Sequence, residues 1–138
     1  MFGEKNIIGE KVVSLDNKGR LYLPTFTFAE ENDELVLLTA PSSSDYLEIY
    51  NSKYIDNLIF YNNLEKSPDL YKIKKEESEE LLKRTICYLK VDCVRRVNIT
   101  AEIKKRYNIS SKPLVKGLGN HINVYKDEET FLKLERKK

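Results

Sequence analysis

The chain is organised around the nine residues Asp16-Asn17-Lys18-Gly19-Arg20-Leu21-Tyr22-Leu23-Pro24. An Asx residue, a Lys and a Gly in this order are typical of a tight turn, and the alternating apolar residues after them predict a short strand that ends at the Pro. A second copy, Asp92-Cys93-Val94-Arg95-Arg96-Val97-Asn98-Ile99-Thr100, begins 76 residues later. The stretch Leu47-Glu48-Ile49-Tyr50 also returns, 75 residues later, as Ile122-Asn123-Val124-Tyr125. These paired repeats indicate an internal duplication.

The elements around the two copies follow a similar order. Strands are predicted at residues 5–13, 34–39, 46–50, 86–91, 114–116 and 121–125, with a turn at 117–120. Helices are predicted at 52–61, 69–84, 101–107 with Thr100 as its cap, and after a cap at Asp127. We therefore expect a first half-unit at 1–61, a linker and helix at 62–84, and a second half-unit at 85–138. Half-units of about 50 residues with short strands bury little core alone, so we expect a mostly β protein with short helices whose halves interlock into one barrel-like body.

The composition is typical of a soluble globular protein, with 41% hydrophobic and 33% charged residues. No apolar run approaches the roughly 20 residues of a membrane-spanning helix, and residues 1–5 do not begin a secretory signal, so we expect a cytoplasmic protein without a membrane partner. Cys87 and Cys93 have no metal-binding spacing, and His121 is the single His, so we expect structural thiols and neither metal nor cofactor. Motifs of common enzymes, such as a P-loop or G-x-S-x-G, are missing, which argues against an enzyme and a small-molecule substrate.

The net charge of +2 conceals an asymmetry between the two parts of the chain. Residues 1–69 contain 6 Lys and Arg against 12 Asp and Glu, a net charge of −6, whereas residues 70–138 contain 18 against 10, a net charge of +8. Three interpretations are open: a surface that binds a polyanion, opposite charges that meet when subunits assemble, or a solvated lysine-rich surface.

Residues 16–24 closely resemble the D-x-K-G-R-x-x-x-P signature of the MraZ family, bacterial transcriptional regulators with two tandem AbrB-type swapped-hairpin units. Residues 115–125, VKGLGNHINVY, are similar to the G-x-G-N-x-I-E-I-W stretch near that family's C-terminus. The resemblance covers nearly the whole chain, including the linking helix with Arg84. It implies a pseudo-symmetric double swapped-hairpin β-barrel and a ring-shaped homo-oligomer. It also implies a nucleoid-associated regulator that binds repeated sites on double-stranded DNA.

In that family the D-x-x-x-R motif of each half lies at the DNA face. The resemblance therefore implies six DNA-binding residues here: Asp16, Lys18 and Arg20 in the first copy, and Asp92, Arg95 and Arg96 in the second.

Physical chemistry is compatible with these roles. An Asp that begins a tight turn accepts backbone N–H bonds, and its carboxylate can hold the Arg four residues later. Gly19 allows the positive φ that such a turn requires. The Arg then offers a preset fork of donors to a phosphate or a guanine edge, and Lys18 adds a phosphate contact. The alternative is that both Asp–Arg pairs only hold their turns, although surface ion pairs stabilise proteins weakly.

The chain also departs from the family pattern. Arg95 stands where the family has Gly, and Thr100 where it has Pro; Arg95 could strain the second turn or add a cation. Asn123 and Tyr125 replace the Glu and Trp of the C-terminal stretch. These departures and the acidic first part keep a second function open, an oligomeric interaction or scaffold protein that binds no specific DNA.

Overall fold

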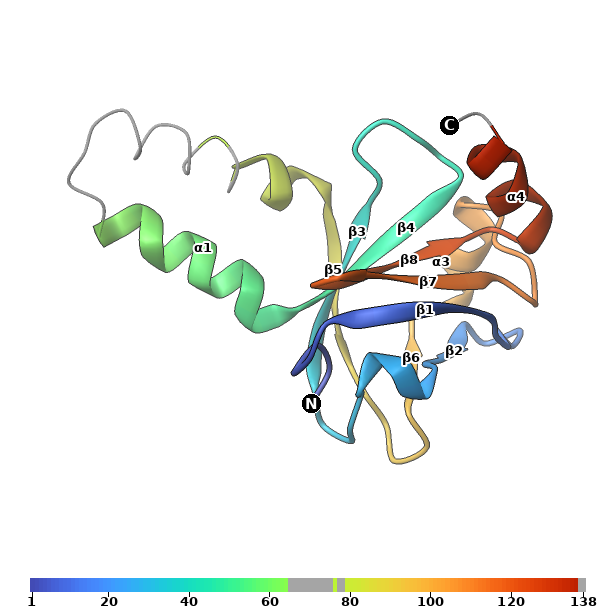
Figure 1. The fold of residues 1–138 in the computed structure, drawn as a ribbon, viewed down its shortest axis with the longest axis horizontal. Helices are drawn as coiled ribbons and strands as arrows, with labels where there is room; N and C mark the ends of the chain where they lie inside the picture. The colour runs from blue at the N-terminus through green and yellow to red at the C-terminus, as the bar shows by residue number, and fades with distance from the viewer. Residues whose placement is uncertain (65–75, 77–78, 137–138) are drawn as a thin grey trace.

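The computed structural model describes residues 1–64, 76 and 79–136 (Figure 1). In these residues the strands are β1 (Ile7–Val12), β2 (Arg20–Tyr22), β3 (Glu34–Thr39), β4 (Tyr46–Asn51), β5 (Thr85–Lys90), β6 (Arg96–Asn98), β7 (Leu114–Gly119) and β8 (His121–Tyr125). The helices are the 3-10 turn η1 (Thr25–Thr27), α1 (Ser52–Leu64), α3 (Ala101–Arg106) and α4 (Glu128–Arg136). Residues 76 and 79–84 are also helical. The prediction of a mostly β protein with short helices is confirmed.

Six of the strands form one antiparallel sheet in the order β1-β7-β8-β4-β3-β5. The order is symmetric about its centre: β1 and β5 lie at the two edges, β7 and β3 come next, and β8 and β4 lie in the middle. The two strands of each pair come from corresponding places in the first and second parts of the chain. β1 pairs with β7 of the later hairpin, and β5 pairs with β3 of the earlier hairpin. The opening strand before each motif therefore extends the hairpin that follows the other motif. This exchange intertwines the two parts of the chain.

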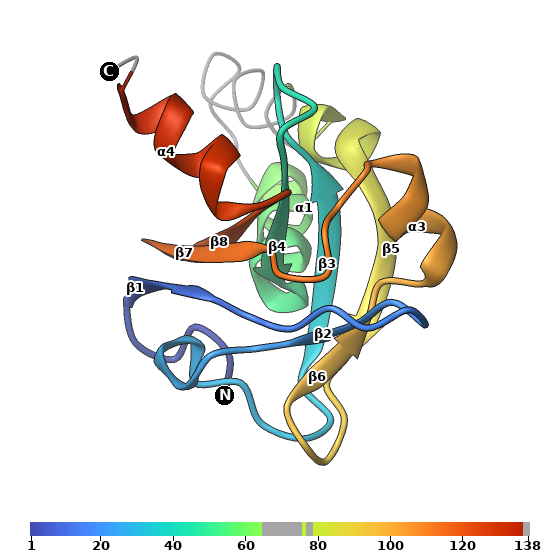
Figure 2. The ribbon, with the colours of Figure 1, turned by 90° about the vertical axis from the view of Figure 1, so that its right-hand side faces the viewer.

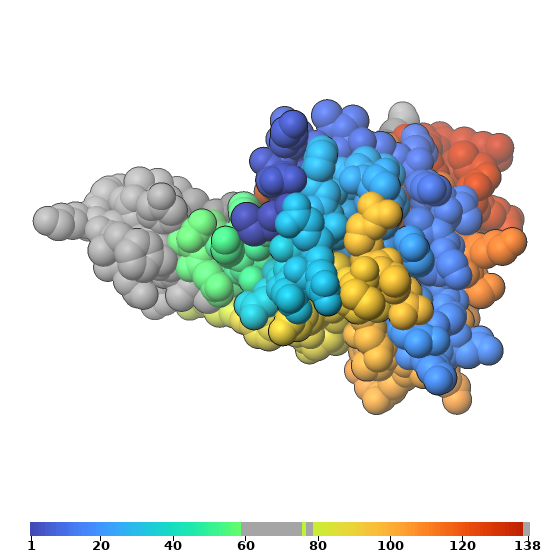
Figure 3. All heavy atoms as spheres, turned by 90° about the horizontal axis from the view of Figure 1, so that it is seen from below, coloured from blue at the N-terminus to red at the C-terminus, as the bar shows by residue number. Residues whose placement is uncertain are grey.

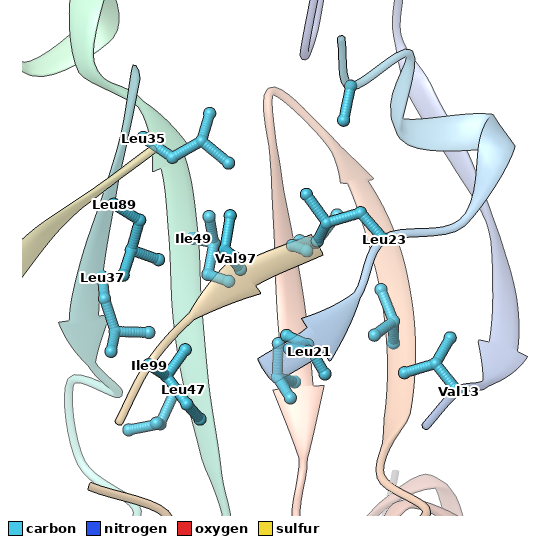
Figure 4. Close-up of a cluster of buried hydrophobic side chains, with 14 of the residues drawn as sticks. Val13, Leu21, Leu23, Leu35, Leu37, Leu47, Ile49, Leu89, Val97 and Ile99 are labelled. Carbon is cyan, nitrogen blue, oxygen red and sulfur yellow. The ribbon is translucent and has the colours of Figure 1, made fainter. Parts of the chain in front are cut away.

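The remaining strands, β2 and β6, form a separate antiparallel ribbon that packs on the core side of the sheet. Figure 2 shows this ribbon and α4 on opposite sides of β7 and β8. Figure 4 shows Leu21 of β2 and Val97 of β6 among side chains of the sheet, such as Leu37 and Ile49. All four side chains are at most 1% exposed. Burial of these side chains ties the ribbon to the sheet.

Two predicted helix caps are confirmed. Thr100 Oγ1 accepts the N–H of Ile103 at 3.2 Å, and Asp127 Oδ1 accepts the N–H of Thr130 at 2.7 Å. Each side chain thereby satisfies a backbone N–H in the first turn of α3 or α4 that has no partner inside the helix.

Several predicted boundaries differ from the structure by one or two residues, such as 5–13 for β1, and two differ by three. The strand predicted at 114–116 continues as β7 to Gly119, because Gly117 lies against β1: a Cβ there would come within 2.5 Å of the Ile7 carbonyl oxygen. The helix predicted at 52–61 continues as α1 to Leu64, so the predicted linker does not begin at residue 62. The rest of the linker, at 65–68, and much of the helix predicted at 69–84 lie outside the described residues. The half-unit boundaries stay a prediction.

The sheet face opposite the ribbon is covered by helices and contains a buried ion pair. Glu48 Oε1 lies 2.7 Å from Arg84 Nη1, and the two side chains are 8% and 13% exposed. Arg84 Nη1 also donates to the carbonyl of Thr39 at 2.7 Å. In the part of the chain that the structure describes, no helix is long and apolar enough to cross a membrane.

Candidate functional site

The first turn is held by the carboxylate of Asp16. Its Oδ1 accepts the backbone N–H groups of Lys18 at 3.0 Å and Arg20 at 2.9 Å, and its Oδ2 accepts Arg20 Nε at 2.6 Å. The backbone N–H of Arg20 is the largest cause that lowers the pKa of Asp16 below its ordinary value, and its guanidinium adds to the effect. The carboxylate is therefore ionised at neutral pH and fixes both the turn and the Arg20 side chain.

The second turn repeats this arrangement. Asp92 Oδ1 accepts the N–H groups of Val94 at 2.9 Å and Arg96 at 2.8 Å, and its Oδ2 accepts Arg96 Nε at 3.0 Å. Burial raises the pKa of Asp92, but the N–H groups of Arg96 and Val94 and the Arg96 guanidinium outweigh it, so this pKa too is lowered. The replacement of polar turn residues by Cys93 and Val94 leaves these bonds intact, because they use backbone N–H groups.

The ribbon places the two turns at its opposite ends. Leu21 pairs with Val97, Arg20 with Asn98, and Tyr22 with Arg96. Each turn is also tied to the other copy of the motif. The Ile99 N–H donates to the Gly19 carbonyl at 2.8 Å, and the Leu23 N–H donates to the Arg95 carbonyl at 2.9 Å. The structure thus brings the two copies together as one nearly two-fold symmetric unit.

The outer face of the ribbon carries four polar side chains. Successive residues of a strand point to opposite faces, so buried Leu21 and Val97 leave Arg20, Tyr22, Arg96 and Asn98 on the outside. The side chains of Arg20 and Arg96 are 39% and 31% exposed. Figure 3 shows the blue surface of the first motif beside the amber surface of the second.

Both arginines present a free end of defined orientation. Their Nε atoms are bound to Asp16 and Asp92, and among the described residues no hydrogen bond is found for the two terminal nitrogens of either guanidinium. A guanidinium held in this way matches two acceptors side by side, such as phosphate oxygens or the O6 and N7 atoms of guanine.

Lys18 is exposed on the first turn, and Arg95 is half-buried on the second. Arg95 also lines an open pocket of about 720 Å³ beside β2, together with Lys11 and Lys112. The six residues implied by the resemblance thus lie on or next to one ribbon, with further cations beside it.

Two outward-facing residues, Tyr22 and Asn98, were not among the sequence-predicted site residues. Tyr22 is 43% exposed, and Asn98 Oδ1 accepts the N–H of Thr100 at 2.8 Å, which leaves the Asn98 amide nitrogen as the donor. A signal for them existed in the sequence, since each lies two residues after an Arg of the motif and therefore on the same strand face.

The structure explains why one turn has Gly and the other Arg. A Cβ at Gly19 would lie 2.3 Å from the carbonyl carbon of Thr100, whose φ of 76° turns its backbone toward the first turn. At the corresponding position, Pro24 has a φ of −62°. Arg95 has a φ of 59°, in the left-handed region that a non-glycine residue occupies at moderate cost. Arg95 therefore adds a cation, and the second turn keeps its hydrogen bonds.

Comparison with known proteins supports a relationship to the MraZ family. A protein of Mycoplasmoides gallisepticum named Transcriptional regulator MraZ is 27% identical to this chain over 118 residues. The aligned region covers 86% of this chain and 80% of that protein. No family model matches the chain.

Proposed function

We propose that this chain is a non-enzymatic transcriptional regulator that binds double-stranded DNA sequence-specifically through the outer face of the β2–β6 ribbon. The observation that carries the proposal is the pair of arginines, Arg20 and Arg96, each held by an Asp on one exposed two-stranded ribbon. The major groove of B-DNA, about 12 Å wide, admits a two-stranded β-ribbon. The similarity to a protein named as a transcriptional regulator supports the same function.

The Asp16–Arg20 and Asp92–Arg96 ion pairs favour recognition of DNA bases as well as binding of the DNA phosphate backbone. An Arg whose Nε is fixed loses little side-chain entropy when its terminal nitrogens bind, and its planar fork matches guanine better than a flexible Lys does. Lys18 and Arg95 lie at the two turns, and we expect them to contact phosphates on either side of the bases.

The proposal includes a cyclic homo-oligomer. One ribbon offers few base contacts, so useful affinity requires several chains that bind repeated sites together. The net charges of −6 for residues 1–69 and +8 for residues 70–138 suit head-to-tail contacts between neighbouring chains. Sedimentation at high protein concentration and low salt tests this part of the proposal, and a profile of monomer alone would contradict it.

DNA binding is tested by fluorescence anisotropy with labelled genomic promoter fragments and random duplexes at several salt concentrations. We expect affinity to fall steeply with salt, and Arg20→Ala to weaken binding to the preferred fragment by about 1–3 kcal/mol. Lys18→Ala should weaken all duplexes similarly and reduce the salt slope by about 1. Arg136→Ala is the matched control, because Arg136 is exposed on α4, on the side of the sheet away from the ribbon.

Two results would contradict the proposal. If no duplex binds below about 100 μM at low salt, where non-specific binding is normally measurable, the chain is better described as an interaction or scaffold protein. If Arg20→Ala keeps the affinity and the salt slope of the parent chain, Arg20 does not contact DNA.

A further inference from the structure

The β2–β6 ribbon has a local two-fold axis. Some of its outward-facing residues are identical to the residues that this axis relates them to, and others are not. Leu21 lies opposite Val97, its counterpart in the second copy, so the axis passes between them. Rotation about this axis exchanges Arg20 with Arg96, and both keep equivalent bonds to an Asp. The same rotation exchanges Tyr22 with Asn98, which differ in size and chemistry.

The spacing of the two arginines follows from their register. They lie on neighbouring strands and two residues apart along the ribbon, because Arg20 pairs with Asn98 and Arg96 with Tyr22. With a rise of about 3.4 Å per residue and strands about 4.8 Å apart, their Cα atoms are separated by roughly 8 Å. This separation corresponds to about two to three base pairs at roughly 3.4 Å per pair.

The two strands of a DNA duplex are antiparallel, so the duplex has local two-fold axes that exchange its strands. When the two-fold axis of a bound protein coincides with such an axis, the protein residues that it relates contact bases on opposite strands. We propose, building on the DNA-binding function proposed above, that the site bound by one chain is an imperfect palindrome. Arg20 and Arg96 contact bases of the same type on opposite strands, about two to three base pairs apart. Tyr22 and Asn98 make the flanking base pairs different in the two halves.

The two differing side chains set different preferences. Asn98 lies beside Arg20, and its amide nitrogen donates to an acceptor on a base edge, such as the N7 atom of a purine. Tyr22 lies beside Arg96 and presents an aromatic ring, which suits an apolar contact with the methyl group of thymine. Tyr22 and Asn98 are therefore the specificity-determining residues that distinguish the two halves of the site.

The experiment is selection of a randomised duplex library by the full chain and its variants, followed by sequencing. We expect the parent chain to enrich a site with two like bases on opposite strands. Arg20→Ala should lose the base preference at one of these two positions and Arg96→Ala at the other. At each position the enrichment of the preferred base should fall by roughly 5- to 150-fold. Tyr22→Asn makes the outer face symmetric and should convert the site into a perfect palindrome with the preference of the Asn98 half. Asn98→Tyr should yield a palindrome with the preference of the Tyr22 half.

Tyr54→Asn is the matched control, since Tyr54 is exposed to 36% on α1, away from the ribbon, and this variant should enrich the parent site. Circular dichroism confirms that each variant is folded, and the two opposite exchanges at positions 22 and 98 test the inference independently. The inference is overturned, with the proposed function intact, if the two Arg variants lose preferences on the same strand or if neither exchange changes the symmetry of the site. If the parent chain enriches no sequence at all, the proposed function fails as well.

Discussion

Replacement of Gly19 by Ala should destabilise the protein far more than the same change at the corresponding Arg95. A Cβ at Gly19 would lie 2.3, 2.5 and 2.7 Å from the carbonyl carbon, carbonyl oxygen and Cα of Thr100. All three are backbone atoms at the start of α3, so no side-chain rotation relieves the contact. The carbonyl of Gly19 also accepts the Ile99 N–H at 2.8 Å, so displacement of the turn weakens the pairing of β2 with β6.

The magnitude follows from two costs. A residue with a Cβ pays about 1–2 kcal/mol for the positive φ of 88° at this position, and an overpacked site costs typically about 1–3 kcal/mol more. We therefore expect Gly19→Ala to lower the free energy of unfolding by about 2–5 kcal/mol, a large part of the stability of an ordinary domain. Arg95→Ala keeps a Cβ at a position that already accommodates one, so we expect less than about 1 kcal/mol.

The assay is urea-induced unfolding of the parent chain and both variants, followed by circular dichroism and by the fluorescence of the nine tyrosines, since the chain has no Trp. Equal midpoints and slopes for Gly19→Ala and Arg95→Ala would refute the account of the two turns. In that case the close approach of Thr100 to Gly19 does not hold in solution.

Three further outcomes are expected. Thr100→Gly should be more stable to urea than Thr100→Ala by about 1–3 kcal/mol, because both lose the cap but only Gly adopts a φ of 76° and a ψ of 151° without strain; equal stabilities would contradict this. Glu48→Ala should cost about 3–5 kcal/mol in urea unfolding, because it removes the buried carboxylate 2.7 Å from Arg84 and leaves only the exposed Glu80 carboxylate at 3.8 Å; Glu48→Leu with Arg84→Met should cost much less, and similar losses would show that the ion pair itself is required. Because the pKa values of Asp16 and Asp92 are lowered in the folded chain, their contribution to stability is complete above the unfolded pKa of about 4 and is lost as the pH falls through the lower folded values. Between about pH 5 and pH 2 the free energy of unfolding should therefore fall less for the Asp16→Asn, Asp92→Asn double variant than for the parent chain. An equal fall in both proteins would contradict a contribution of the two carboxylates to the pH dependence of stability.

The sequence by itself determined the local elements and the duplication. The turns at Asp16 and Asp92, the strand after each, and the caps at Thr100 and Asp127 depend on bonds between residues at most four apart, so the order of residue types is enough to predict them. The repeated motif also revealed that both turns belong to one kind of unit. These local signals correctly identified both Asp–Arg pairs.

Only the tertiary structure decided how the two copies combine. The pairing of β2 with β6 joins residues about 76 positions apart, and a register of this range has no local signal because it depends on the burial of Leu21 and Val97 against the whole sheet. That pairing puts Tyr22 and Asn98 on the same face as the two arginines. It also brings Thr100 against Gly19, so the glycine is required in the first turn, while the second turn, facing Pro24, accommodates an Arg.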